Sequence, residues 1–230
     1  MTLLDENIRA QLREVFADLK HPVKIVFFGD EAENCEYCED TRQLLTEVAD
    51  LALDKIHLET YDLKGNPELA KKYRVERAPG FVILGMRGNE ILDYGVRYAG
   101  IPAGHEFTSL INDIINVSRQ DSGLKKETRE GLTKLHDPVS IQVFVTPSCP
   151  YCPRAVILAH QMAIESPLIE AEMVEALEFP KLADEYGVSG VPHTVINVQK
   201  SNGQRGFEEV VGAVPEKNLL EAILAAANPA

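Results

Sequence analysis

Apolar and polar positions change their period several times along the chain, and this predicts helices and strands in a fixed order. Each half is expected to open with an amphipathic helix, because its apolar residues recur every three or four positions. A short run rich in β-branched and aromatic residues then predicts a strand that ends in a turn, at 23–28 and again at 139–145. The two opening apolar stripes are Ile8, Leu12, Phe16 and Leu19, and Leu124, Leu132 and Leu135.

A second helix and a second strand are predicted after each of these strands. The second strands are expected near 56–61 and 169–174. A strand-helix-strand unit of this length implies a parallel pair with a right-handed crossover. The helices between the strands carry apolar stripes at Leu44, Leu45, Val48 and Leu51, and at Val156, Ile157, His160 and Ala163.

Each half is then expected to continue with a short helix, a hairpin and a closing helix. Asn66-Pro67 suits a helix start, because Asn caps helices and Pro fits the first turn. The hairpin turns are predicted at 87–89 and 201–203, where Gly and Asn occur together. The fold class is therefore α/β, with a central mixed sheet flanked by helices in each half.

The two halves also share a spacing of particular residues. The first cysteine of each Cys-x-x-Cys motif, Cys35 or Cys149, precedes a proline, Pro79 or Pro192, by 44 or 43 residues. The segments around these prolines align, with Tyr, Val, Pro, Val and Ile at matching positions. This self-similarity indicates a duplicated unit of about 110 residues. The polar stretch 118–123 is the expected boundary, which gives units at 1–118 and 119–230.

Composition and charge narrow the function. The 230 residues are 45% hydrophobic and 26% charged, as in an ordinary globular protein. No apolar run approaches about 18 residues and the N-terminus does not resemble a secretory signal, so no membrane span is expected and a cytoplasmic location is predicted. A net charge of −13 disfavours binding to phosphate backbones and anionic membranes. Neither nucleic acid nor a membrane is therefore expected as a partner.

The four cysteines form two Cys-x-x-Cys pairs with none left over, which is too few for a disulfide scaffold. A Cys-x-x-Cys motif between a strand and a helix, followed by the distant proline, resembles the thioredoxin fold, and here it covers nearly the whole chain twice. Cys-Pro-Tyr-Cys at 149–152 is the glutaredoxin-type motif. The tandem arrangement is similar to the glutaredoxin-like protein disulfide oxidoreductases of thermophilic prokaryotes, which are related in architecture to protein disulfide isomerase. Cys-Glu-Tyr-Cys at 35–38 departs from the glutaredoxin form at Glu36.

This resemblance implies two tandem thioredoxin-like units that reduce, form or isomerise protein disulfides. Redox-active cysteines would take the place of a cofactor, and no metal is implied. The family has cis prolines at the positions of Pro79 and Pro192. They would present the backbone of Ala78 and Val191 to an extended substrate segment, which pairs with it as a strand.

Disulfide exchange needs a thiolate that attacks and a second thiol that resolves the mixed disulfide. Unpaired N–H groups at a helix start favour negative charge, so the pKa of the first cysteine of each motif is expected to be lowered. The second cysteine, one turn inside the helix, would be shielded. Cys35 and Cys149 are therefore predicted to attack, and Cys38 and Cys152 to resolve.

The two motifs differ in charge. Like charges would raise the pKa of Cys35 relative to that of Cys149. No acidic residue occurs at 146–154, where Arg154 would favour the thiolate if it turned toward the motif and Pro150 would fix the first helical turn. The second site is therefore predicted to dominate, although the acidic run is equally explained as a solvated face. The acidic residues at the first motif are Asp30, Glu31, Glu33, Glu36, Glu39 and Asp40.

The cysteine pairs also allow interpretations other than a protein disulfide oxidoreductase. Two cysteine pairs can form a zinc site, but the separation of these pairs is far from the usual spacing. An electron relay from a flavin-dependent reductase to a peroxiredoxin is an alternative, against which the retention of both cysteine pairs counts. A redox-controlled chaperone or binding module is the third function. His193 is expected to be a structural or surface residue and not a ligand or base. Tyr37 and Tyr151 suit either an apolar rim or plain packing.

Overall fold

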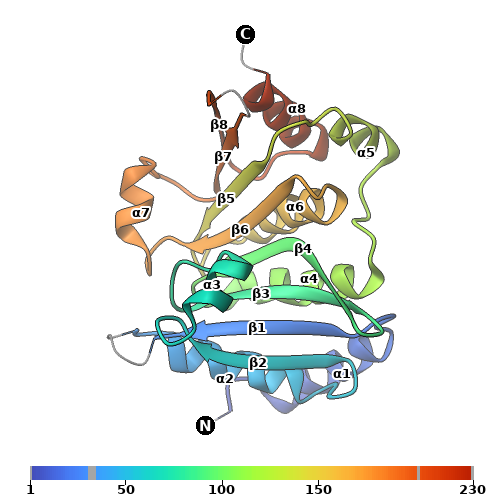
Figure 1. The fold of residues 1–230 in the computed structure, drawn as a ribbon. Coiled ribbons are helices and arrows are strands. Elements are labelled where there is room, and N and C mark those ends of the chain that lie inside the picture. The colour runs from blue at the N-terminus through green and yellow to red at the C-terminus, as the bar shows by residue number, and fades with distance from the viewer. Residues whose placement is uncertain (1, 31–34, 201–202, 229–230) are drawn as a thin grey trace.

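The computed structural model describes residues 2–30, 35–200 and 203–228. Helices and strands follow one another in the predicted order in both halves (Figure 1). The first half contains α1 (Glu6–Ala17), β1 (Val23–Gly29), α2 (Cys38–Ala49), β2 (Ile56–Asp62), α3 (Pro67–Tyr73), β3 (Gly80–Arg87), β4 (Glu90–Ala99), the 3₁₀ helix η1 (Gly104–Glu106) and α4 (Phe107–Arg119). The second half contains α5 (Lys126–Leu132), β5 (Val139–Val145), α6 (Cys152–Glu165), β6 (Ile169–Glu175), α7 (Pro180–Glu185), β7 (His193–Gln199), β8 (Arg205–Val211) and α8 (Glu216–Ala227).

The strands of both halves form one eight-stranded mixed sheet in the order β2-β1-β3-β4-β6-β5-β7-β8. The predicted parallel pairs are present as β1 with β2 and β5 with β6. The two units meet where β4 pairs in parallel with β6, through 96–99 and 171–174. The sequence predicts one sheet per unit, and the structure joins the two because each unit has an edge strand whose backbone groups need partners.

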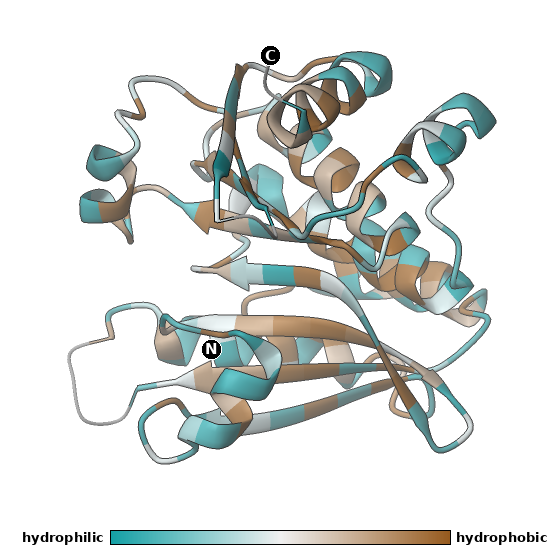
Figure 2. Ribbon diagram, turned by 45° about the horizontal axis from the view of Figure 1, so that its top comes forward, coloured by the Kyte–Doolittle hydropathy of each residue, from teal (hydrophilic) through white to brown (hydrophobic). Residues whose placement is uncertain are grey.

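Helices cover the two faces of the sheet unequally. The long helices α2, α4, α6 and α8 pack with α1 on one face, and their apolar residues form a core cluster that runs through both units. The short helices α3 and α7 each cover a small cluster on the other face. Figure 2 shows hydrophobic residues along the inner strands and on the helix faces that turn toward them. No helix in the described part of the chain combines the length and apolar character needed to cross a membrane.

Several predicted details are corrected. Leu124 and Leu135 lie outside α5, yet both are buried because the segments that flank this short helix pack on the same core. Asn66 precedes α3 as predicted, but its side chain donates to the carbonyl oxygen of Asp62 at 3.0 Å and does not cap the helix. The polar stretch 118–123 begins inside α4, where Ser118 is buried.

The sequence also predicts two hairpin turns and a boundary between the units. The first hairpin turns at residues 88–89 as predicted, with Gly88 in the left-handed region at φ 59°. Residues 201–202 of the second predicted turn lie outside the described residues. The division into units at 1–118 and 119–230 stays a prediction.

Candidate redox sites

Each Cys-x-x-Cys motif lies in the turn that joins a parallel strand to a helix. Cys38 is the first residue of α2 and Cys152 the first residue of α6, while Cys35 and Cys149 precede them. Each pair is closed as a disulfide, with Cα atoms 5.4 Å apart in the first motif and 5.5 Å apart in the second. The second cysteine of each motif therefore begins its helix and does not lie one turn inside it, because a tight turn that contains the first cysteine precedes each helix.

The start of α6 presents a backbone donor to the predicted attacking sulfur of the second motif. The N–H of Cys152 donates to Sγ of Cys149 at 3.1 Å. The first N–H groups of a helix have no partner within it and favour negative charge. A thiolate on Cys149 would accept this bond. The role of Cys149 as the attacking residue stays a prediction. In the first motif, the N–H of Asp30 contacts Sγ of Cys38 at 3.4 Å.

The second motif is the more deeply buried of the two. Cys149 is 8% exposed and Cys152 is fully buried, whereas both cysteines of the first motif are partly exposed. The first unit contacts the turn of this motif, because the N–H of His105 donates to the carbonyl oxygen of Pro147 at 3.0 Å. The low exposure of Cys149 restricts access to its sulfur. The predicted dominance of the second site stays a prediction.

The distant prolines lie at the same end of the sheet as the cysteines. The peptide bonds Ala78–Pro79 and Val191–Pro192 are both cis, the isomer that the family resemblance implies. Pro79 directly precedes β3, which pairs with the end of β1, and Pro192 precedes β7, which pairs with the end of β5. Ala78 and Val191 are partly exposed, while the prolines are buried. The role of these four residues in substrate binding stays a prediction.

Tertiary contacts alter the charge pattern at the first motif. Lys64 lies 3.2 Å from Asp30, and Arg42 lies 2.5 Å from Glu39, so part of the acidic run is paired. Glu36 is exposed, and Glu31 and Glu33 lie outside the described residues. The fold also brings acidic residues from the second unit to this motif. The pKa of the Tyr37 hydroxyl is raised by Glu36, by partial desolvation, and by Glu178 and Glu175.

The remaining predicted tuning residues lie at the second motif. Pro150 is in the turn before α6, so Pro153 and not Pro150 occupies the first helical turn. Arg154 is exposed, and its influence on Cys149 stays a prediction. Tyr151 is 64% exposed and Tyr37 is 37% exposed, which fits a rim around each site better than core packing.

A buried polar cluster at the junction between the units was missed by the sequence reasoning. His160 of α6 contacts Asp113 of α4 at 2.5 Å, and the same carboxylate accepts the hydroxyl of Tyr98. Nearby Glu106 is 1% exposed and accepts a bond from Ser109, and its burial raises its pKa to about 7. The available signal was a polar residue on an apolar helix stripe, at His160, but its partners come from the other unit.

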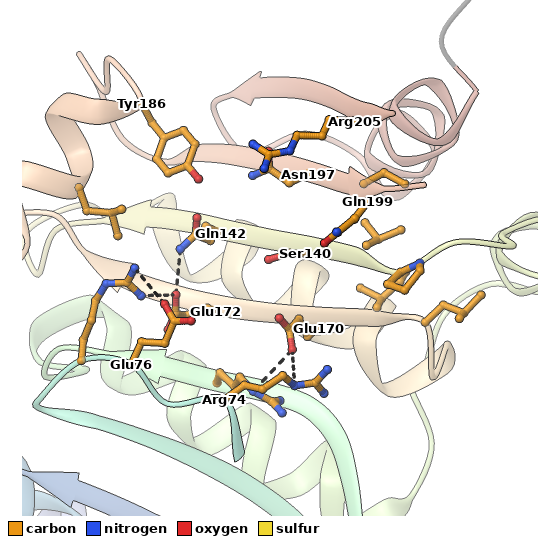
Figure 3. Close-up of a pocket in the computed structure, with 18 of the residues that line it drawn as sticks. Arg74, Glu76, Ser140, Gln142, Glu170, Glu172, Tyr186, Asn197, Gln199 and Arg205 are labelled. Carbon is orange, nitrogen blue, oxygen red and sulfur yellow. Dashed lines mark hydrogen bonds and ion pairs between the residues drawn. The ribbon is translucent and has the colours of Figure 1, made fainter. Parts of the chain in front are cut away.

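Sequence reasoning also missed a polar hollow of about 760 Å³ on the face of the sheet that carries the short helices α3 and α7 (Figure 3). Two of its arginines face carboxylates: Arg74 lies 2.8 Å from Glu170, and Arg77 lies 3.5 Å from Glu172. The hollow reaches the start of β5 and β6, at the end of the sheet opposite the cysteines. It also extends to Arg77, the residue before Ala78, but none of the described residues that line it is a cysteine. Within the described residues, no three His, Cys, Asp or Glu side chains gather as a metal site requires.

The single sheet carries two Cys-x-x-Cys disulfides, each just before a helix, and two cis prolines at the same end of the sheet. These features define a thioredoxin-fold disulfide protein of two units. A thioredoxin domain model matches residues 139–225. A protein disulfide oxidoreductase of Aeropyrum pernix is 36% identical, with a TM-score of 0.83 over 98% of this chain and 95% of that one. The chain belongs to this protein disulfide oxidoreductase family, which confirms the resemblance.

Alkyl hydroperoxide reductases contain a similar region. The N-terminal domain of the Enterococcus faecalis enzyme is 30% identical, with a TM-score of 0.82 over 96% of this chain and 99% of that one. The F component of the alkyl hydroperoxide reductase of Pseudomonas putida is 26% identical over 213 residues, which is 92% of this chain and 37% of that protein. The chain thus spans little more than a third of the length of the curated relatives it matches.

Proposed function

We propose that the chain catalyses dithiol–disulfide exchange with protein substrates through its two Cys-x-x-Cys sites, with the second site dominant. The observation that carries the proposal is the disulfide at each helix start with a cis proline at the same end of the sheet. The direct N–H contact to Sγ of Cys149 supports the assignment of this residue as the main nucleophile.

In the reducing direction, the Cys149 thiolate attacks one sulfur of a substrate disulfide. A bond forms between these two sulfurs as the substrate S–S bond breaks, and the leaving sulfur takes up a proton. The Cys152 thiolate then attacks Cys149, which releases the second substrate thiol and leaves the protein as its disulfide. Two electrons have passed to the substrate, and a dithiol donor must restore the reduced site. The oxidising direction is the reverse of these steps.

Substrate recognition rests on backbone contacts in this proposal. An extended substrate segment pairs with the backbone of Ala78 at the first site and of Val191 at the second. The exposed rings of Tyr37 and Tyr151 add apolar contact beside the cysteines. Such recognition tolerates many substrate sequences. The cysteines carry the electrons, so the proposal needs no metal or organic cofactor. We also propose that the reaction occurs in the cytoplasm.

The first test is the reduction of insulin by dithiothreitol, followed as turbidity. We expect the unsubstituted protein to hasten precipitation, Cys149→Ser to remove most of this activity near neutral pH, and Cys35→Ser to remove less. Equal losses would contradict the dominance of the second site. Suppressed precipitation, without any reduction, would instead indicate a chaperone and refute the exchange activity.

A second candidate is an electron relay from a flavin-dependent reductase to a peroxiredoxin. The observation that favours the relay is the match to part of an alkyl hydroperoxide reductase, in which 92% of this chain is aligned. A coupled assay tests the relay: this chain is mixed with a flavin-dependent reductase, a peroxiredoxin, a reduced nicotinamide cofactor and peroxide. If the chain is the relay, the oxidation of the nicotinamide cofactor by peroxide should require it. Reduction of insulin without peroxide turnover in the coupled assay would eliminate the relay and leave the general oxidoreductase.

A further inference from the structure

The cis proline of the first site is connected to a carboxylate of the second unit. Glu178, in the segment between β6 and α7, accepts the N–H of Ile101 through Oε1 at 2.7 Å. Gly100, the residue before Ile101, donates its N–H to the carbonyl oxygen of Pro79 at 2.8 Å. Two successive backbone groups therefore join Glu178 to the residue beside which the substrate is proposed to bind.

This connection is tightly packed. The N–H of Glu178 donates to Oε2 of Glu175 at 2.6 Å, and Glu175 is 2% exposed. A Cβ added to Gly100 would lie 2.5 Å from Cβ of Glu175 and 2.8 Å from Oε1 of Glu178. Gly100 also has a φ of 99°, which glycine adopts readily. The segment from the second unit therefore leaves the backbone after β4 little freedom to move.

The second site has the same backbone bond without this support. Gly212 donates its N–H to the carbonyl oxygen of Pro192 at 2.8 Å, as Gly100 does to Pro79. A Cβ added to Gly212 would meet no atom within 4 Å in the described structure. The contact with a second unit therefore distinguishes the first site from the second, although the two units share their local fold.

We propose that Glu178 of the second unit is a positioning residue of the first redox site, because it fixes across the junction the backbone that holds cis-Pro79 in place for substrate pairing. This inference rests on the proposed exchange activity. Removing the carboxylate frees the N–H of Ile101 and lets Gly100 and Pro79 shift. The alignment of an extended peptide then suffers, while the exchange chemistry of the cysteines themselves is retained.

The carboxyl group of Glu178 also changes its charge near neutral pH. Burial raises its pKa, and so do Glu175 and Glu36; against the opposing bond from Ile101 they bring it to about 7. An ionised carboxylate is the stronger acceptor, so the support of Pro79 is expected to strengthen as the pH rises through this range. The titratable and charged groups around Glu178 are Glu175, Glu36 and Tyr37, together with Arg77, Lys181 and Glu185, which line a second hollow with Glu178.

The test uses the full chain with the second site silenced by Cys149→Ser and Cys152→Ser. The rate constant of the reduced first site is measured with a peptide disulfide, which needs backbone pairing, and with hydroxyethyl disulfide, which does not. We expect Glu178→Ala to slow the peptide reaction about tenfold, as for the loss of a hydrogen bond to a charged group, and the small disulfide less than about twofold. Glu178→Gln keeps an acceptor oxygen and should restore most of the rate.

The matched control is Glu185→Gln on α7, an exposed carboxylate that lines the second hollow with Glu178 and has no bond to Ile101. It should leave both rates unchanged. The ratio of the two rates should also rise with pH around 7 in the parent, and Glu178→Gln should lose this rise. Equal slowing of both disulfides, or an unchanged ratio, would overturn the positioning role. Failure of the unsubstituted protein, with both sites intact, to reduce insulin would refute the proposed function itself.

Discussion

Replacing Glu47 by Gln tests how strongly the N-terminal segment is held to α2, the helix of the first redox site. The Glu47 carboxylate accepts the backbone N–H groups of Leu3 and Leu4 at 2.8 and 2.9 Å. It also accepts bonds from the guanidinium of Arg9 and the amide of Gln43, both at 2.9 Å. Glutamine has the same shape but carries no charge, and its amide group cannot accept all four donors.

The magnitude follows from the pKa of this carboxyl. Burial opposes its ionisation, but the hydrogen bonds from Gln43, Leu3, Leu4 and Arg9 outweigh burial and lower the pKa from 4.5 to about 2. A difference of this size corresponds to about 3 kcal/mol of stability. Because the folded pKa lies below the unfolded one, this stability is present above pH 4.5 and is lost as the pH falls toward 2.

Urea denaturation of the parent and of Glu47→Gln at a series of pH values measures this contribution. The parent should be more stable by about 3 kcal/mol near neutral pH, and this difference should shrink to about 1 kcal/mol near pH 3. The control is Glu14→Gln, an exposed carboxylate on α1, which should change stability by less than about 0.5 kcal/mol. A difference between parent and Glu47→Gln that stays constant with pH would refute the reasoning.

Two further predictions concern the junction between the units. Burial raises the pKa of Glu106 from 4.5 to about 7, so its ionisation destabilises the fold as the pH rises through this range. Relative to the parent, the free energy of unfolding of Glu106→Gln should therefore rise by up to about 3 kcal/mol between about pH 5 and pH 8, as measured by urea denaturation. A difference in stability between the two proteins that does not change with pH would contradict this. Gly100→Ala, with a φ of 99° and a Cβ 2.5 Å from that of Glu175, should cost at least about 2 kcal/mol in the same assay. Retention of full stability would show that the backbone after β4 can shift.

Much of each unit could be predicted from the sequence because the relevant signals are local. The period of apolar residues changes at each strand and helix, and the turn at Gly88 has residues suited to its backbone. The positions of both cis prolines followed from their spacing to the cysteines, through the family resemblance. The exact helix start was missed by one turn, since the residues of a tight turn and of a first helical turn look alike in sequence.

The sequence by itself therefore determined the duplication, the order of elements and the positions of the cysteines and prolines. Only the tertiary structure decided that β4 pairs with β6, which joins the units into one sheet. That pairing brings Glu178 to the first site and His105 to the second. An edge strand shows that it needs a partner but not which strand will supply it, so contacts between the units are absent from any local pattern.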